Sequence, residues 1–582
     1  MLVAIDWVVI LVFILLSLAV GLSVTRSAGK NMSSYFLGGR NLPWYLAGIS
    51  MVATTFAADT PLAVAELVGQ NGISGNWLWW NMLAGGMLTT FFFANLWRRS
   101  GVLTEVELIE LRYSGKPAAF LRGFKALYLG LFMNAIIISW VNVALISIFE
   151  GFFGLSNSDA FLYTAGLMFI AAVNASLSGL LGVALTDAIQ FVIAMTGCIV
   201  LAVLVLNSEQ IGGIAGLKEQ LPAETFQFFP NIGAEGSGSV LAISVGTFFA
   251  YIGLQWWASW YPGAEPGGGG YVAQRMMSAK NEKHAVYATL FFQIAHYCIR
   301  PWPWIIVALC ALALYPELSD ADKKMGYIYA MRDFLPAGLK GLLIVAFIAA
   351  YMSTITTQLN WGASYVVNDF YHRFLNKQAA QKHLILVARL TTLSLMIIGL
   401  YVSTQVNSIK GLWSFIIECG AGLGLVLILR WYWWRINAWS EITATIAPFL
   451  AYAACKFWFE IPFPNSFFIT IAFTTISWIV VTFLTQPTDT DALSKFYNTI
   501  RPDGNWSPFS SDLSGQDNSN QKNRLAGLFG AWISAVVMTY SILFASGKLI
   551  FMEWTQAVFW MAIALLGFGL LRYSLRYTRI FH

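Results

Sequence analysis

Six polar side chains interrupt an apolar stretch, residues 347–368, that is long enough to span a bilayer. They are Ser353, Thr354, Thr356, Thr357, Gln358 and Asn360. Hydrocarbon offers no hydrogen bonds, so these groups need partners within the protein or a water-accessible cavity. If the stretch is helical, the carbonyl of Ala350 meets the hydroxyls of Ser353 and Thr354 on one face. Three neutral oxygens that converge in this way suit a small, hard monovalent cation that binds and later leaves.

A second polar site is predicted in the apolar span that begins near Pro43 and contains Pro61. Proline lacks an N–H group and disfavours helical geometry in the residue before it, so the helix is expected to open just before Pro61. Carbonyls near residues 53–57 would then be free. A kink relieved by neighbouring helices is the alternative. Asp59 and Glu66 favour the open helix, because a carboxylate deep in a span is costly unless it faces a cavity or a partner.

Three further features have a functional and a structural interpretation. Asp187, in the segment GVALTDAIQ, either pairs with a loop lysine or lies on the cytoplasmic route of a departing cation. The seventh span is expected to contain a partner break through Gly246 and Gly253, although glycine is common in membrane helices. An aromatic cluster follows, which is either an interfacial belt or a gate and stacking platform for a solute. Its members are Gln255, Trp256, Trp257, Trp260 and Tyr261.

The elements that position these residues are membrane helices. Of the 582 residues, 58% are hydrophobic and 11% are charged, which no soluble globular domain needs. Windows of about 20 apolar residues predict an all-α polytopic membrane protein with about 15 transmembrane helices. The five cysteines and five histidines lack metal-ligand spacing, and the net charge of +5 is too dispersed for a nucleic-acid surface.

Lysines and arginines in short loops predict the orientation of the chain in the cell membrane. The loops assigned to one face include Arg26 and Lys30 after the first span, Arg275 and Lys280 after the seventh, and Arg430 after the eleventh. The N-terminus is therefore expected outside and the C-terminus in the cytoplasm. The first span has no cationic region before its apolar stretch, so it is expected to remain as a helix rather than to act as a signal peptide.

Several segments together resemble the sodium:solute symporter family. They are SYFLGGRNLPWYLAGISMVATTFAADT, GVALTDAIQ, VAQRMMSAKNEKHA, AFIAAYMSTITTQLNWGASYVVNDFY and WRINAWSEI, and they cover most of residues 34–441. The resemblance implies a leucine-transporter-type core of two inverted five-helix repeats, with one helix before it and about four after it. The expected segments are a first helix over 1–24, repeats over 43–207 and 238–433, further helices over 437–484 and 525–577, and a cytoplasmic loop over 486–523.

The resemblance also implies a sodium site between the opened second span and the polar ninth span. The implied ligands are the carbonyls of Ala53, Phe56 and Ala350 and the hydroxyls of Ser353 and Thr354. Asp187 matches an acidic residue of the family that is thought to assist ion exit or a second ion site. Gln274 and Arg275 match a pair at the cytoplasmic end of a span, for which a structural or gating role is expected. Thr55 stands where proline-type members carry aspartate, so a proline substrate is not favoured.

These observations predict a secondary active transporter, not an enzyme, that couples inward sodium flow to symport of a small polar solute by alternating access. Asp59, Thr60, Glu66 and the aromatic cluster are the solute-binding candidates. Paired acids and aromatic rings favour a sugar or polyol. An amino acid or organic acid is the alternative, although no unpaired cationic side chain is evident to hold its carboxylate. A passive channel would need rings of repeated charge, and a membrane sensor would need a signalling domain.

Overall fold

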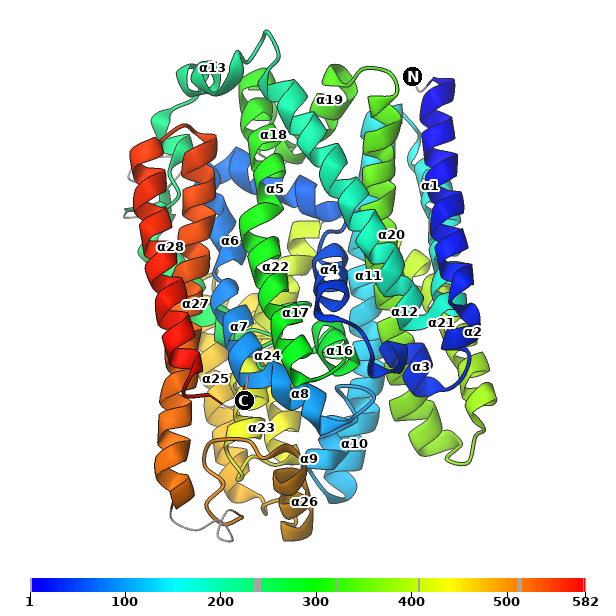
Figure 1. Cartoon of the computed structure of the whole chain (residues 1–582), viewed down its shortest axis with the longest axis vertical. Coiled ribbons are helices and arrows are strands. Elements are labelled where there is room, and N and C mark those ends of the chain that lie inside the picture. Colours follow the sequence, from blue (N-terminus) through cyan, green and yellow to red (C-terminus); the bar gives the residue numbers. More distant parts are fainter. Residues whose placement is uncertain are drawn as a thin grey trace.

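The computed structural model describes residues 3–233, 242–320, 322–406, 409–509, 516–578 and 580, and within these ranges it is mostly helical (Figure 1). Most of the long helices run along the long axis of the molecule. Two three-residue strands, β1 (Asn231–Gly233) and β2 (Ala242–Ser244), pair in parallel.

Nine helical segments in the described part of the chain are long and apolar enough to cross a membrane. They are α1 (Ala4–Ser23), α10 with α11 (Gly115–Phe153), α12 (Asn157–Leu206), α17 with α18 (Glu282–Leu314), α20 with the turn that follows it (Leu339–Leu375), α21 (Gln381–Ser403), α25 (Asn465–Leu484), the Lys522–Ile550 part of α27 (Gln516–Ile550) and α28 (Trp554–Leu575). A bent pair, α4 (Trp44–Thr54) and α5 (Asp59–Asn71), passes the same test as one span.

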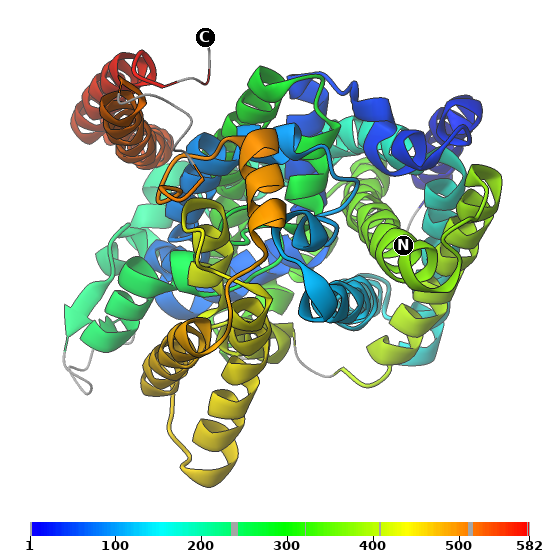
Figure 2. The same ribbon diagram turned by 90° about the horizontal axis from the view of Figure 1, so that it is seen from below.

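Shorter helices connect or flank these spans. They are α2 (Thr25–Ala28), α3 (Met32–Leu37), α6 (Trp77–Trp80), α7 (Leu83–Leu88), α8 (Ala94–Ser100), α9 (Leu108–Arg112), α13 (Gly213–Gln220), α14 (Val245–Phe249), α15 (Trp256–Ala258), α16 (Gly270–Ser278), α19 (Lys323–Phe334), α22 (Ile409–Cys419), α23 (Leu423–Tyr432), α24 (Ala438–Ala453) and α26 (Thr490–Ile500). Seen from below, α27 and α28 form a pair at one corner of the molecule, and α24 and α25 form another (Figure 2).

Helix α12 is too long to be a single span. Its 50 residues would extend about 75 Å at 1.5 Å per residue, more than twice the thickness of the hydrocarbon core of a bilayer. The helix bends at Gly179, whose φ of +56° and ψ of −167° are accessible only to glycine. An added Cβ there would lie 2.6 Å from the carbonyl oxygen of Tyr35. Two of the predicted spans, with their short connection near this glycine, therefore form this one element.

The prediction for the seventh span was wrong in detail. Gly246 lies in α14 and Gly253 in the π-helical turn Ala250–Gln255, so neither interrupts the helix. The chain instead leaves helical geometry between the end of α15 and the start of α16, over residues 259–269, which contain two prolines and four glycines. The segment VAQRMMSA, expected in a loop, forms most of α16. Residues 238–241, where the second repeat was expected to start, lie outside the described residues.

The predicted loop over residues 486–523 also contains more structure than expected. It includes α26, whose Leu493, Phe496 and Ile500 are buried, because these apolar residues recur at the spacing of one helix face. Residues 510–515 of this segment lie outside the described residues. Phe496 packs against the ring of Trp431 in α23, and buried Trp506 donates to the carbonyl of Trp431 at 3.0 Å, so this segment is docked on α23.

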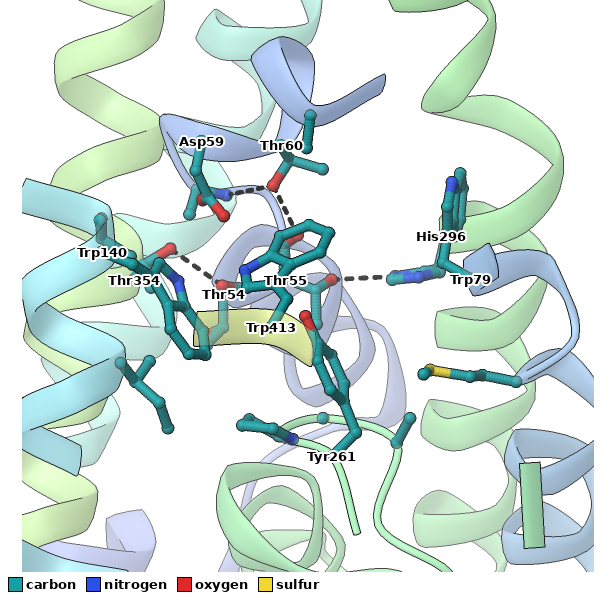
Figure 3. Close-up of a pocket in the computed structure, with 18 of the residues that line it drawn as sticks. Thr54, Thr55, Asp59, Thr60, Trp79, Trp140, Tyr261, His296, Thr354 and Trp413 are labelled. Atoms are coloured by element: carbon teal, nitrogen blue, oxygen red, sulfur yellow. Dashed lines mark hydrogen bonds between the residues drawn. The ribbon is translucent and has the colours of Figure 1, made fainter. Parts of the chain in front are cut away.

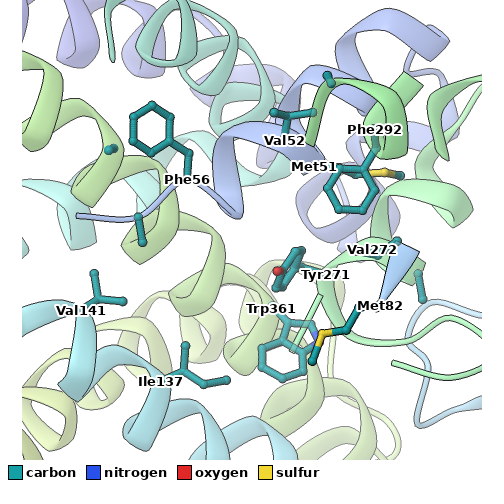
Figure 4. Packing of buried hydrophobic residues seen from close by; sticks show 14 of the residues in the cluster. Met51, Val52, Phe56, Met82, Ile137, Val141, Tyr271, Val272, Phe292 and Trp361 are labelled. Carbon is teal, nitrogen blue, oxygen red and sulfur yellow. The ribbon is translucent and has the colours of Figure 1, made fainter. Parts of the chain in front are cut away.

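The apolar core surrounds the gap between α4 and α5. Figure 4 shows Met51 and Val52 of α4 and Phe56 of the gap among side chains from distant parts of the chain, including Phe292 and Trp361. All five are buried. Close packing on every side fixes the position of this non-helical backbone in the interior of the molecule.

Candidate functional site

The site is built around the gap between α4 and α5, whose axes differ in direction by 60°. Residues 55–58 separate the two helices, and Pro61 lies in the first turn of α5, where its missing N–H group costs nothing. The prediction that this span opens just before Pro61 is confirmed. A broken helix exposes carbonyl oxygens that an intact helix would use internally.

Thr354 of α20 joins its own helix to the edge of this gap. Its Oγ1 lies 2.9 Å from the carbonyl oxygen of Thr54 and 3.2 Å from that of Ala350, and the side chain is buried (Figure 3). The hydroxyl donates its proton to one of these oxygens at a time, which leaves its lone pairs available. The carbonyl of Ala53 accepts from the N–H of Phe56 at 3.0 Å. Two of the predicted ligand groups, at Ala350 and Thr354, therefore lie beside the open turn that carries Ala53 and Phe56.

Ser353 contacts a buried carboxylate rather than the gap directly. Its hydroxyl donates to Asp187 Oδ1 at 2.7 Å, and the hydroxyl of Ser50 donates to Asp187 Oδ2 at 2.5 Å. Arg275 Nη2 lies 3.6 Å from the same Oδ2. Asp187 is thus fully buried within α12 and paired with Arg275. The interpretation in which it pairs with a loop lysine is therefore wrong. Because Ser353 gives its proton to Asp187, the oxygen of Ser353 keeps its lone pairs free.

Arg275 links α16 to α4 and α20. Its Nη2 donates to Thr357 at 2.7 Å and its Nε donates to Ser50 at 3.1 Å. Thr357 lies 3.0 Å from Thr54, so this network reaches the last residue of α4. The neighbouring Gln274 donates to Asn360 and to the carbonyl of Phe36, both at 3.0 Å. Arg275 is fully buried and Arg430 is nearly so, which corrects the prediction that both are loop cations.

A cavity of about 110 Å³ adjoins the gap between α4 and α5. Of the predicted solute-binding residues, Asp59, Thr60 and Tyr261 line it, together with Thr54 and Thr354 (Figure 3). Thr60 Oγ1 accepts from the N–H of Ala57 at 3.2 Å, which fixes the hydroxyl at the mouth of the gap. Asp59 Oδ1 is buried and has no hydrogen-bond partner among the described residues.

The other predicted solute-binding residues lie outside this cavity. Glu66 accepts from Gln70, one turn further along α5. Gln255 donates to the carbonyl of Leu78 at 3.1 Å. The indole of Trp256 packs at a tilt against the indole of Trp532 in α27. Trp257 donates to the carbonyl of Gly253 within its own segment, and Trp260 lies on a different, smaller pocket with Glu105. The non-helical segment that follows α15 turns the chain, so Tyr261 is the one member of the aromatic cluster that lines the cavity.

Several cavity residues were missed at the level of sequence, among them Trp79, Trp140, His296, Arg300 and Trp413. His296 and Arg300 stand four residues apart in an apolar span, and an ionisable residue within a span is a recognised signal for a functional site. The tryptophans carry no such signal, because tryptophan is common throughout this chain. Their convergence depends on the packing of α6, α11, the helix with Arg300, and α22.

His296 and Arg300 form a chain of hydrogen bonds to the gap. Arg300 Nη2 lies 3.1 Å from His296 Nε2, and Arg300 Nη1 donates to Thr55 Oγ1 at 2.9 Å. A guanidinium can only donate, so Nε2 of His296 accepts and the proton of the neutral ring is on Nδ1. His296 Nδ1 lies 3.0 Å from Thr55 Oγ1 and therefore donates to it (Figure 3). The hydroxyl of Thr55 in turn donates a hydrogen bond to the carbonyl of Val52 at 2.9 Å or to that of Met51 at 3.2 Å.

The chain is similar to several membrane transport proteins. It is 23% identical over 515 residues to the sodium/glucose cotransporter of Vibrio parahaemolyticus, covering 84% of this chain and 92% of that protein. It is 24% identical over 474 residues to the human sodium/myo-inositol cotransporter 2, covering 74% of this chain and 66% of that protein. It spans 59% of the mouse sodium/glucose cotransporter 4, at 24% identity.

A solved structure shares the fold. The outward-open, substrate-bound structure of a Na+-coupled sialic acid symporter superposes with a TM-score of 0.68 at 20% identity, covering 84% of this chain and 99% of that one. Residues 35–447 of this chain match the sequence profile of the sodium:solute symporter family. This match extends over more than half of the 582 residues and contains every part of the site described above, from the gap after α4 to Trp413. The chain belongs to the sodium:solute symporter family.

Proposed function

We propose that this protein is a secondary active transporter that uses inward sodium flow to drive uptake of a small polar solute by alternating access. The observation that carries this proposal is the contact between the broken α4–α5 span and α20 through the buried hydroxyl of Thr354. A discontinuous helix in the interior of a bilayer is tolerated where its free backbone groups line a polar site. Membership of the symporter family supports the same conclusion.

The proposed sodium site comprises the carbonyls of Ala53, Phe56 and Ala350 and the hydroxyls of Ser353 and Thr354. The residues fit a sodium ion because all five groups are neutral oxygens that are buried away from lipid. Among the described residues, none donates a hydrogen bond to the carbonyl of Phe56. Neutral oxygens hold a monovalent cation without the strong attraction of a carboxylate, so release into the cytoplasm stays fast. Asp187 orients Ser353 from outside this set and remains a candidate for the exit path.

The proposed solute site is the adjoining cavity. Asp59, Thr60 and Tyr261 are retained from the sequence prediction, and His296 and Arg300 are added. Glu66, Gln255, Trp256, Trp257 and Trp260 are omitted because they lie outside the cavity. Aromatic side chains offer flat apolar surface at low cost in side-chain entropy, which suits a small solute that must be enclosed and then released.

The gap between α4 and α5 couples the two sites. Thr54 contributes its carbonyl to the contact with Thr354, and the next residue, Thr55, holds His296 and Arg300. A sodium ion that fixes the backbone here also fixes the groups that face the solute. Such coupling works only if sodium prefers the conformation that binds solute. A membrane potential of 100 mV adds about 2.3 kcal/mol for each sodium charge.

The proposed architecture keeps the two inverted repeats, over residues 43–207 and 238–433. A broken span near the start of each segment supports it, at residues 55–58 and at residues 259–269. The helix over 1–24 precedes the repeats, and the helices within 437–484 and 525–577 follow them. The proposed orientation places the N-terminus outside and the C-terminus in the cytoplasm, supported by exposed Arg26, Lys30 and Lys116.

The test is sodium-dependent uptake in proteoliposomes that contain the double variant Ser353→Ala, Thr354→Ala. We expect sodium stimulation to be lost with normal yield of folded protein, because both substitutions remove ligand oxygens and neither introduces a clash. The matched control is Thr356→Ala on the same helix. Thr356 is buried, but its hydroxyl donates to carbonyls of its own helix, those of Met352 and Ser353. Unchanged sodium dependence in the double variant would reject the assignment.

A further inference from the structure

The cavity is lined by two opposite charges that form no ion pair among the described residues. Asp59 is 3% exposed and Arg300 is 2% exposed, and both line the cavity. Neither lies within 4.0 Å of an oppositely charged side chain among the described residues, and Asp59 Oδ1 has no hydrogen-bond partner there. Removing a charge from water without a partner is strongly unfavourable, and in a membrane protein such groups mark the route or the site of a ligand.

Arg300 differs from the other buried cations of this chain. Arg122, Lys125, Arg275 and Arg430 each have a carboxylate within 4.0 Å. Arg112 has none, but it donates to the carbonyl oxygens of three residues and its guanidinium lies over three aromatic rings, which compensates its burial.

Arg300 has a smaller set of neutral partners. It donates to Thr55, to the ring and the carbonyl of His296, and weakly to the carbonyl of Val52, and it lies over the single ring of Trp304. These contacts orient the guanidinium, but they leave it without an ion pair among the described residues, and the attraction of Asp59 reaches it without direct contact. One N–H of Nη2 has no partner among the described residues, and the bond from Nη1 to Val52 is weak at 3.5 Å, so these two nitrogens can turn to a carboxylate, which accepts two parallel hydrogen bonds.

The other side of the cavity favours a cation. Asp59 supplies a negative charge, and the rings of Trp140, Tyr261 and Trp413 line the same space, whereas Trp79 lies beside His296 with ring centroids 5.5 Å apart. The face of an aromatic ring attracts a cation, most strongly for tryptophan, and the attraction increases when water is excluded. One small molecule with a carboxylate at Arg300 and an ammonium group near Asp59 would therefore neutralise both side chains.

We propose that the transported solute is a zwitterion that carries a carboxylate and an ammonium group a few bonds apart, such as an α-amino acid or a betaine. This inference rests on the proposed function, and it replaces the sugar or polyol favoured by the sequence. An uncharged polyol would leave both charges without an ion pair. A simple organic acid would satisfy Arg300 but would meet the repulsion of Asp59. The Arg300 side chain determines which end of the zwitterion lies next to the gap after α4.

The test is a thermal-shift screen of the purified full chain in sodium and in potassium buffer. The probes are the standard α-amino acids and glycine betaine, with glucose, myo-inositol and acetate as uncharged and anionic comparisons. We expect sodium alone to raise the melting temperature, and at least one zwitterion to raise it further in sodium only. A further shift with glucose or myo-inositol and with none of the zwitterions would overturn the inference. Absence of any sodium shift would instead count against the proposed function.

Variants separate the role of Arg300 from general stability. Arg300→Gln should weaken zwitterion binding at least tenfold, measured as the further shift that the zwitterion adds to the shift by sodium in the same variant. Arg300→Lys keeps the charge without the planar fork and should restore part of the affinity, which a purely structural role would not predict. Asp59→Asn tests the other end, with the same expected loss. The control is Arg332→Gln, at a surface pair with Asp333, where the arginine side chain is 48% exposed. Unchanged zwitterion affinity in Arg300→Gln would overturn the assignment.

Discussion

Asp187 contacts one of the proposed sodium ligands and a buried cation at the same time. It accepts hydrogen bonds from Ser50 and Ser353 and lies beside Arg275, so it orients one proposed sodium ligand and neutralises one buried cation. An amide at this position could do neither fully. We expect Asp187→Asn to lower the maximal uptake rate by about tenfold or more, which is about 1.4 kcal/mol, while the solute KM changes much less. Initial rates in proteoliposomes over a range of solute concentrations measure both.

The control for this residue is Glu66→Gln. Glu66 is another acid on a membrane helix, but it lies outside the cavity and away from the proposed sodium ligands. Its substitution should leave both the maximal rate and the KM close to those of the unmodified protein. Normal transport by Asp187→Asn would show that neither the orientation of Ser353 nor the ion pair with Arg275 limits turnover.

At the scale of elements, the bend in α12 places Asp187 beside α4 and α20. The bend depends on Gly179, because a side chain there would approach the carbonyl oxygen of Tyr35 at 2.6 Å and would need a backbone conformation that only glycine adopts readily. We expect Gly179→Ala to destabilise the protein by about 1–3 kcal/mol from the backbone conformation alone. A lower melting temperature and a lower yield of monodisperse protein in detergent are the measurements.

Gly166 provides a matched comparison within the same helix. It has helical geometry, and an added Cβ would meet no atom within 4 Å. Gly166→Ala should therefore leave the melting temperature unchanged or slightly raised, because alanine has the higher helix propensity. Equal melting temperatures for the two variants would contradict the requirement for glycine at the bend.

At the scale of the whole molecule, a buried charge cluster joins segments that are far apart in the sequence. Glu441 of α24 pairs with Lys125 of α10 and with Arg430 of α23 at 3.2 Å, and it accepts from the hydroxyl of Tyr113 at 3.0 Å. Removing one partner of such a cluster leaves uncompensated charge. We expect Glu441→Gln to cost about 3–5 kcal/mol of stability, measured as a fall in melting temperature and in the fraction of monodisperse protein.

An exposed ion pair shows the contrast. Arg99 and Glu282 lie 2.6 Å apart, with side chains 29% and 40% exposed, so water and salt screen their interaction. Glu282→Gln should cost no more than about 1 kcal/mol. If the two glutamate variants melted at the same temperature, the buried cluster would not hold α10, α23 and α24 together.

The sequence by itself determined the features that depend on local chemistry. Proline at position 61 predicted the open turn, because the missing N–H group acts on the adjacent residues. The spacing of Ala350, Ser353 and Thr354 placed three oxygens on one helix face, and the apolar windows predicted a polytopic membrane protein, although the described residues contain nine to ten candidate spans rather than about 15. In the described structure, Thr354 does reach the carbonyl of Thr54, the last residue before the gap.

The tertiary structure alone decided which distant groups meet. The pairing of Asp187 with Arg275, the presence of Arg300 in the cavity and the exclusion of Trp256 from it all depend on how separate helices pack. In a soluble helix, one apolar face reveals the direction of the core. The helix of Thr354 is surrounded by other helices, with 94% of its apolar window buried, so its sequence carries no such directional signal. Partners across helices follow from packing and charge pairing, which no single segment encodes.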